Sequence, residues 1–277
     1  MFQSTTRPKS SLGSALNIAE LVYHNSVRAV RKAHGNAFMA IFMNMLQSII
    51  FVLAFYFMFQ IMGMRSAALR GDFMIYIMTG VFLYMTHTKT MGAVAGSEGP
   101  ASPMMQHAPM NTAIAIAAAM VSTLYIQVLS LFAILFVYDV AFNPFVMQEI
   151  YDPIGCLAML LLSWFSGAAI GMVVLAVKPW FPTPVSILST VYQRANMIAS
   201  GKMFVANTLP GYMLVMFDWN PLFHTIDQSR GYAFVNYVPR NSSWEYAFYL
   251  SIVLVMIGLM GEFYTRKHAS VSWGARR

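Results

Sequence analysis

Long apolar stretches, separated by short polar segments, set the pattern of this chain. Six of them come close to or exceed the length of about 20 helical residues that crosses a hydrocarbon core about 30 Å thick. In chain order they cover residues 37–62, 73–91, 112–138, 154–177, 185–207 and 244–264. The pattern predicts an all-α membrane protein whose six transmembrane helices occupy a domain of residues 37–264.

The fifth stretch carries more polar residues than a lipid-facing helix would keep. At about 100° per residue, one face of this helix collects Ser186, Ser189, Thr190, Gln193, Met197 and Ser200. Arg194 lies at the edge of that face and roughly 13 Å from Val185, at about 1.5 Å per residue. A charge near the middle of a membrane costs at least about 2.5 to 3.5 kcal/mol and usually faces a bundle interior or an aqueous path. We therefore predict that this helix lines a conduit.

The conduit residues predicted from the fifth stretch are Gln193, Arg194, Asn196 and Lys202. For Arg194 the alternative to a substrate contact is structural: a buried pair with Glu98 or Glu262, or a cap on backbone carbonyls. Lys202 lies far from the polar face around the helix axis. It therefore either contacts the substrate or extends to the outer interface of the membrane.

The first stretch has a polar and aromatic face of its own. The inner half of this face is polar and the outer half aromatic, with Asn44, Gln47, Ser48, Phe51, Phe55 and Phe59 in chain order. Aromatic rings suit the apolar faces of sugar rings as well as neighbouring helices. These residues are therefore predicted either to line the conduit or, for the aromatic ones, to pack in the core.

The N-terminal segment, residues 1–36, contains an amphipathic helix pattern over residues 12–32. Its apolar positions recur at steps of three and four residues: Leu12, Leu16, Ala19, Tyr23, Val27 and Val30. A basic amphipathic helix beside a span commonly lies in the membrane surface. We predict an interfacial helix here, with an ordinary solvated helix as the alternative.

Two segments between predicted spans break the regular pattern. Residues 92–111 contain Pro100, Pro103 and Pro109, which exclude one long helix and leave either a short docking helix or a plain loop. Residues 208–243 are too apolar for an ordinary loop and too interrupted for a span. Runs of that length more often re-enter a membrane part-way. Two short re-entrant helices are predicted around residues 219–221, between the fifth and sixth spans.

Small residues mark two places of close helix contact. The third stretch opens with the alanine-rich run 113–119, which lets another backbone approach closely. The fourth stretch contains Gly167 and Gly171 in the G-x-x-x-G spacing, a short and frequent motif for tight helix packing.

Composition supports an integral membrane protein: 58% of the residues are hydrophobic, only 10% are charged, and the mean hydropathy is +0.59. The net charge of +7 reflects topology more than nucleic-acid binding, since basic residues gather at both ends. The positive-inside rule then makes residues 1–36 and the basic tail 265–277 cytoplasmic. It assigns four cations to outer segments, namely Arg65, Arg70, Arg230 and Arg240. Because residues 1–36 lack an apolar signal region, insertion is expected to rely on the spans.

Known catalytic and metal-binding patterns are missing from the sequence. It has no phosphate-binding G-x-x-x-x-G-K-[ST] loop and no zinc-hydrolase motif, and its single cysteine is Cys156. An intramembrane serine hydrolase would need His87 to meet Ser163 or Ser166. We predict that this chain has no catalytic residue, metal or cofactor, so that any ATP and magnesium would be bound by another subunit.

The order of these parts resembles the inner-membrane permeases of type 2 ATP-binding-cassette exporters, in particular those that export capsular polysaccharide and O-antigen. The resemblance covers nearly the whole chain. It rests on the amphipathic helix, the connector 92–111, the pair Gln193 and Arg194 in the fifth span, and the broken segment from Trp219 to His224.

This resemblance implies a homodimeric permease in a bacterial inner membrane that moves a lipid-linked, acidic polysaccharide, while a separate nucleotide-binding subunit hydrolyses ATP. The first and fifth spans of two copies would line the channel. Contacts with the ATP-hydrolysing subunit would fall on Arg28, Arg31, Glu98, Gln106 and His107. The external gate would fall on Trp219, Asn220 and Pro221.

Two other functions compete with export. A membrane-embedded transferase acting on a lipid-linked substrate would need His87 or His224 near an acid or a nucleophile. An ion-coupled carrier would normally show acids inside the spans and repeated halves. The acids here are nearly all in loops and the sequence shows no repeat, so the transferase is the stronger alternative.

Overall fold

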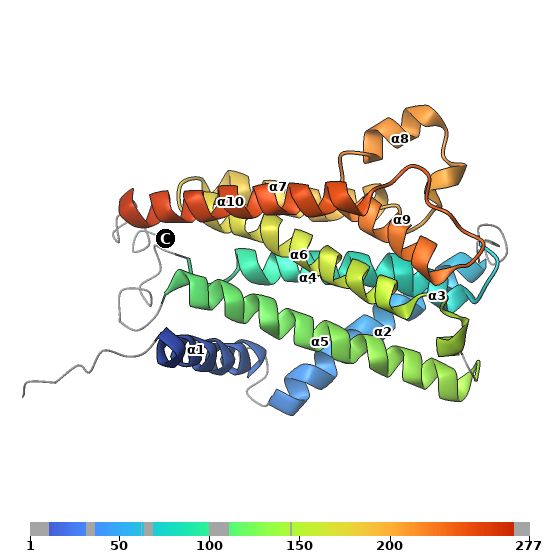
Figure 1. Cartoon of the computed structure of the whole chain (residues 1–277), viewed down its shortest axis with the longest axis horizontal. Helices are drawn as coiled ribbons and strands as arrows, with labels where there is room; N and C mark the ends of the chain where they lie inside the picture. The colour runs from blue at the N-terminus through green and yellow to red at the C-terminus, as the bar shows by residue number, and fades with distance from the viewer. Residues whose placement is uncertain are drawn as a thin grey trace, which may run out of the picture.

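The structure is a computed structural model that describes residues 11–31, 37–61, 63, 69–99, 111–144 and 146–268. Every regular element in these residues is helical, and Figure 1 shows α5, α6 and α10 running along the long axis of the molecule. The all-α prediction is confirmed for the described part of the chain. Of the residues predicted to contact the ATP-hydrolysing subunit, Gln106 and His107 lie outside the described part, as does the side chain of Arg31.

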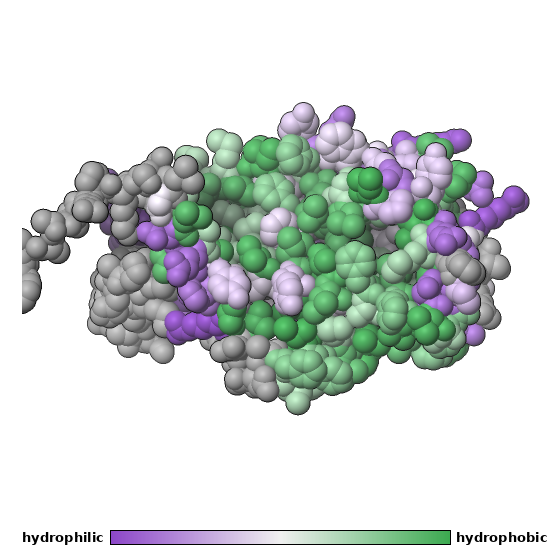
Figure 2. All heavy atoms as spheres, turned by 60° about the horizontal axis from the view of Figure 1, so that its bottom comes forward, coloured by the Kyte–Doolittle hydropathy of each residue, from purple (hydrophilic) through white to green (hydrophobic). Residues whose placement is uncertain are grey.

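Among the residues that the structure describes, four helices are long and apolar enough to cross a membrane. They are α2 (Ala37–Ile61), α5 (Thr112–Ala141), α6 (Pro153–Val177) and α10 (Trp244–His268). Their bounds agree within a few residues with the first, third, fourth and sixth predicted spans. Figure 2 shows hydrophobic side chains over the middle of one face and hydrophilic ones toward both ends. The chain therefore has the character of a membrane-embedded protein.

The second predicted span is three helical segments in direct succession: α3 (Phe73–Ile77), the π-helical η2 (Met78–Phe82) and α4 (Leu83–Ala95). The Asp72 side chain caps the start by accepting the Met74 amide at 2.6 Å. Every residue from 74 to 87 is buried. This segment is thus the central element against which α6, α9 and α2 pack.

The contact between α4 and α6 depends on the predicted glycine pair. A Cβ atom on Gly167 would overlap the carbonyl oxygen of His87, and one on Gly171 would lie 2.8 Å from the carbonyl oxygen of Met91. The Ser163 hydroxyl donates to the carbonyl oxygen of Leu83 at 2.9 Å across the same contact. The prediction that Gly167 and Gly171 mark tight helix packing is confirmed.

The fifth predicted span is shorter than expected. Its helix, α7 (Pro182–Ala199), stops before Gly201, which has a φ of 75°, a left-handed conformation that favours glycine. The prediction of a single helix that reaches residue 207 is therefore wrong. The side of α7 that packs on the rest of the chain carries Val185, Tyr192 and Asn196. The predicted polar face lies next to this packed side of the helix.

Two short helices follow, at the place that the broken segment predicts. They are α8 (Gly211–Phe217) and α9 (Pro221–Ala233), and the Asn220 side chain caps α9 by accepting the Leu222 amide at 3.1 Å. Most of α9 is buried against α6 and α10, while α8 stands off one end of the helix bundle (Figure 1). The helices are confirmed; their entry into a membrane stays a prediction.

The N-terminal helix α1 (Ser11–Arg31) agrees with the predicted range and packs on α5. The Ser26 hydroxyl lies 3.3 Å from the carbonyl oxygen of Ala118, within the predicted small-residue run. On the predicted apolar face, Leu16 and Tyr23 are exposed. That part of the face is consequently free to meet a lipid surface, as an interfacial helix requires.

Candidate functional site

Lys202 is a buried cation surrounded by aromatic rings. Its side chain is 0% exposed, and Nζ lies 3.6 Å from the ring centroid of Tyr84, 4.4 Å from that of Phe55 and 5.5 Å from that of Phe51. Within the described part of the chain, Nζ has no hydrogen-bond partner. We call Phe51, Phe55 and Tyr84 the ring cage. Three of the predicted conduit residues, Phe51, Phe55 and Lys202, thus meet at one point.

The ring cage only partly offsets the cost of burying this charge. Removing an ion from water costs several kcal/mol in a protein, whereas a desolvated cation–π contact contributes about 2 kcal/mol. The rings also accept none of the three N–H donors of the ammonium. The alternative that Lys202 extends to the outer interface is wrong, because the chain turns at Gly201 and the side chain points inward between α2 and α4.

Arg230, on α9, holds the turn that carries Lys202. Its Nη1 donates to the carbonyl oxygens of Gly201 at 2.9 Å and Phe204 at 2.5 Å, and its Nη2 donates to that of Lys202 at 2.9 Å. The guanidinium also lies 4.4 Å from the ring centroid of Tyr76, while Nε has no partner in the described residues. The assignment of Arg230 to an outer segment did not predict this role: the side chain is 1% exposed and crosslinks α9 to the turn.

Gly80, in the π-helical segment η2, makes room for this crosslink. A Cβ atom there would lie 2.9 Å from Nη2 of Arg230 and 3.0 Å from the carbonyl oxygen of Lys202. π-helical turns are frequent at functional sites. The sequence contains a signal for this arrangement: a single glycine in the apolar span 73–91, and an arginine, Arg230, within the broken segment 208–243.

A second link joins a predicted conduit residue to a predicted gate residue. The Asn220 side-chain amide donates to Oδ1 of Asn196 at 2.6 Å and to the carbonyl oxygen of Ala199 at 3.0 Å. It therefore attaches the end of α7 to the start of α9. Of the other two gate residues, Trp219 is 56% exposed and Pro221 is buried in the first turn of α9.

The remaining conduit residues are not brought into the ring cage. Phe59 is buried and packs on Phe73 and Tyr76, which is the core-packing alternative. Asn44 and Gln193 are half-buried, and the carbonyl oxygen of Gln193 accepts the Tyr84 hydroxyl at 3.2 Å. Gln47 is exposed.

Arg194 is exposed on the outer side of α7. The described residues supply no ion pair to it, and neither Glu98 nor Glu262 forms the buried pair considered from the sequence. An exposed arginine also does not cap buried carbonyls. The buried ion pair with Glu98 or Glu262 is therefore absent from the described part of the single chain, and the role of Arg194 stays a prediction.

His87 forms a buried polar network that ties α7 to α4 and α6. Its Nδ1 lies 2.9 Å from the Ser166 hydroxyl and its Nε2 lies 3.0 Å from the Tyr192 hydroxyl. The Ser166 hydroxyl donates to the carbonyl oxygen of Ser163 at 2.9 Å, so Ser166 accepts from Nδ1. A nucleophilic serine would instead donate its proton to the histidine. His87 and Ser166 meet, but in the wrong hydrogen-bond direction for a serine hydrolase.

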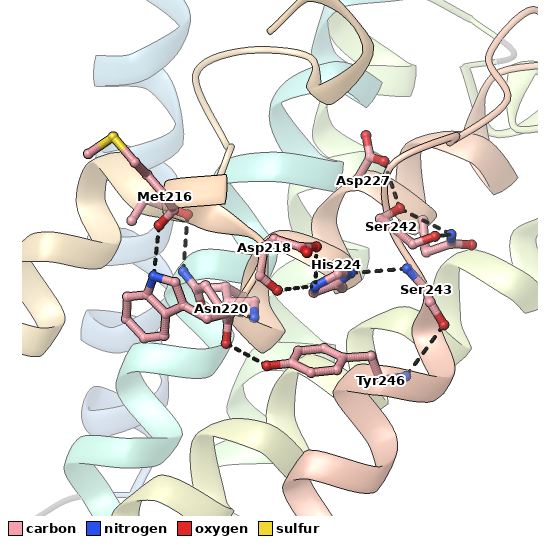
Figure 3. Close-up of polar contacts among 12 residues, drawn as sticks. Met216, Asp218, Asn220, His224, Asp227, Ser242, Ser243 and Tyr246 are labelled. Atoms are coloured by element: carbon pink, nitrogen blue, oxygen red, sulfur yellow. Dashed lines mark hydrogen bonds and ion pairs between the residues drawn. The ribbon is translucent and has the colours of Figure 1, made fainter. Parts of the chain in front are cut away.

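His224 joins the starts of α9 and α10 (Figure 3). Its Nε2 donates to the carbonyl oxygen of Asp218 at 2.7 Å, with the Asp218 carboxylate 3.5 Å away, and its Nδ1 accepts the Ser243 amide at 3.0 Å. The Ser242 hydroxyl donates to Asp227 at 2.7 Å. An acid is near His224, as a transferase would need, yet both ring nitrogens are engaged by backbone groups.

The polar groups beside this histidine are also paired with one another. The buried Tyr237 hydroxyl donates to the Asp227 carboxylate, and burial together with that charge raises the pKa of Tyr237. In the part of the chain that the structure describes, no three His, Cys, Asp or Glu side chains gather as metal ligands. This end of the molecule is thus a hydrogen-bonded scaffold that positions α9.

In comparisons with known proteins, no family model matches the chain and no curated protein matches it. The function is therefore inferred from the arrangement of residues and from the resemblance in the order of parts.

Proposed function

We propose that this chain is the permease subunit of an ATP-binding-cassette exporter that moves a lipid-linked, acidic polysaccharide across the inner membrane of a bacterium. Two copies form the conduit, with six spans in each: the four long apolar helices, the central segment of residues 73–95, and α7. Both termini are cytoplasmic, and α8 and α9 re-enter the membrane from the outer side.

The observation that carries this proposal is the exposure of Arg194. In the single chain its side chain lies on the outside of α7, next to the exposed apolar residues Ile187 and Ile198. A membrane-embedded arginine that faced lipid would be costly. It therefore needs a second protein surface and an aqueous path, and both are supplied if α7 faces its counterpart in a second copy.

The ring cage gives the proposed conduit the chemistry for an acidic glycan. Phe51 is half-buried and Phe55 is buried beside it, with ring centroids 5.0 Å apart. Neighbouring aromatic rings offer apolar faces to sugars, and Lys202 and Arg194 offer charge to acidic groups. A polymer that slides needs many such weak contacts and no single tight one.

The energy for transport comes from a separate subunit in this proposal. The chain lacks a phosphate-binding loop, so ATP and magnesium are bound by the partner. Its docking surface comprises α1 with Arg28 and Arg31 and the connector with Glu98, Gln106 and His107. The gate formed by Trp219, Asn220 and Pro221 is coupled to the conduit through the bond from Asn220 to Asn196.

The test is to purify the tagged protein from its native host in mild detergent and to identify what accompanies it. We expect a stoichiometric partner that carries the phosphate-binding loop, and ATP hydrolysis by the complex. A change of the loop lysine in that partner is the control, because it should abolish hydrolysis without releasing this chain.

The competing function is a membrane-embedded transferase. A chain that purifies alone across several detergents and transfers a sugar or acyl group to a lipid carrier would overturn the exporter proposal. His224 would then be the first residue to replace, because, of the two candidate histidines His87 and His224, it is the one with an acid beside it.

A further inference from the structure

We propose that the Lys202 ammonium occupies the ring cage only in the absence of ligand, and that it leaves the cage when an acidic polymer binds. The ammonium leaves the ring cage to pair with one anionic group of the polymer, and the face of a sugar ring takes its place on Phe51 and Phe55. The structure described above is then the resting state of this site. The identity of the ligand as an acidic polysaccharide rests on the proposed function.

The first support is the contrast between Lys202 and Lys89. The Lys89 ammonium donates to the Ser48 hydroxyl at 3.0 Å, whereas the Lys202 ammonium donates to no group in the described residues and touches only rings. An ammonium has three donors that oxygen acceptors satisfy better than aromatic faces. An incoming carboxylate or phosphate would supply these acceptors.

The second support is that the acid on α9 and the acid that precedes the central segment already have hydrogen-bond partners. Asp227, on the same helix as Arg230, accepts hydrogen bonds from Tyr237 and Ser242. Asp72, which precedes the central segment, caps Met74 and accepts from Tyr138 at 3.1 Å. Within the described ranges no carboxylate forms an ion pair with Lys202, so its partner anion must come from outside the fold.

The third support is that the side chain can move while its backbone stays fixed. Arg230 holds the carbonyl oxygens of the turn, including that of Lys202. The lysine stem itself is flexible, and one wall of its cage, Phe51, is only half-buried. Phe51 is therefore the side of the cage through which we expect the ammonium to leave.

The direct test measures thermal stability and ligand binding of Lys202→Met in nanodiscs of zwitterionic lipid. The probes are hexagalacturonate, which is acidic, and maltohexaose, which is neutral. We expect Lys202→Met to raise the Tm by a few degrees, because an apolar side chain removes a buried unpaired charge. We also expect its affinity for hexagalacturonate to fall by about tenfold or more. Lys178→Met makes the same change at an exposed lysine and should alter neither quantity.

A second variant separates an exchangeable cation from a structural one. Tyr84→Leu removes the cage ring nearest the ammonium, whose centroid is 3.6 Å from Nζ, and leaves Phe51 and Phe55 in place for the sugar. Because the cage competes with the ligand for the ammonium, weakening it should tighten hexagalacturonate binding about threefold. A purely structural role would make Tyr84→Leu and Lys202→Met weaken binding together.

A lower Tm for Lys202→Met, unchanged hexagalacturonate affinity in that variant, or absence of acidic-ligand binding by the wild type would each overturn the inference. So would a Lys202-dependent response to phosphatidylglycerol nanodiscs without any response to hexagalacturonate, because the anion would then be a lipid headgroup. ATP hydrolysis with the co-purified partner is measured on the same variants. A coupled ATPase with a negative Lys202 result removes only this inference, while a missing partner removes the proposed function.

Discussion

Lys202 and Arg230 are two buried cations on opposite sides of one turn, and they differ in how their charge is satisfied. Arg230 donates to three carbonyl oxygens of the turn at residues 201–204, whereas the Lys202 ammonium contacts only rings. The planar fork of a guanidinium suits several fixed acceptors, while an ammonium is a point charge on a flexible stem. Burial alone therefore does not distinguish the two cations, whereas their hydrogen-bond partners do.

The largest effect on stability is expected for Arg230, the cation whose hydrogen bonds are made. Arg230→Met should lower the free energy of unfolding by roughly 3 kcal/mol or more, since each lost hydrogen bond to a charged group is worth about 1.5 to 3 kcal/mol. Denaturation in a mixed-micelle titration measures the change. Arg240→Met is the matched control at an exposed position and should stay within about 0.5 kcal/mol of wild type. Equal effects of the two variants would contradict the crosslinking role of Arg230.

A smaller effect is expected where the turn approaches the central segment. Gly80→Ala places a Cβ atom 2.9 Å from Nη2 of Arg230 and 3.0 Å from the carbonyl oxygen of Lys202, so it should cost about 1 to 3 kcal/mol. Gly92→Ala is the control on α4, where a Cβ atom meets nothing within 4 Å. That change should be neutral or stabilise by up to about 1 kcal/mol through helix propensity. Two similar values in the same titration would argue against the close approach at Gly80.

The smallest effect on stability is expected for an uncharged hydrogen-bonding group, the Tyr192 hydroxyl, which contrasts with the two cations. Tyr192→Phe removes the hydroxyl that lies 3.0 Å from Nε2 of His87, which should cost about 1 kcal/mol. The same titration measures it, with Tyr212→Phe on the exposed side of α8 as the control. No difference between the two tyrosine variants would mean that the His87 network does not hold α7.

The sequence predicts the long helices well because length and composition decide them. The bounds of α2, α5, α6 and α10 follow from apolar runs and from the residues that flank them. The end of α7 could not be predicted in this way. It depends on Gly201 and on Arg230, whose contacts with the turn join residues 26 to 29 positions apart in the chain.

Only some residues of the candidate site were predicted, and its geometry was not. Phe51, Phe55 and Lys202 follow from their unusual positions in apolar stretches, yet their meeting depends on how α2 packs against α4. Tyr84 escaped notice because an aromatic residue in an apolar span carries no signal of its own. Arg230 was assigned to an outer segment because charge counting treats every arginine outside a span as solvated.

The central claim is that the polar face of α7 lines water, and cysteine labelling tests it most directly. In a Cys156→Ala background, Ser186→Cys, Thr190→Cys and Arg194→Cys should react with a charged thiol reagent in native membranes. Leu188→Cys, on the apolar side and 66% exposed in the single chain, should not react because lipid covers it. Labelling of Thr190→Cys and Arg194→Cys no faster than that of Leu188→Cys would contradict the conduit, and with it the proposed function.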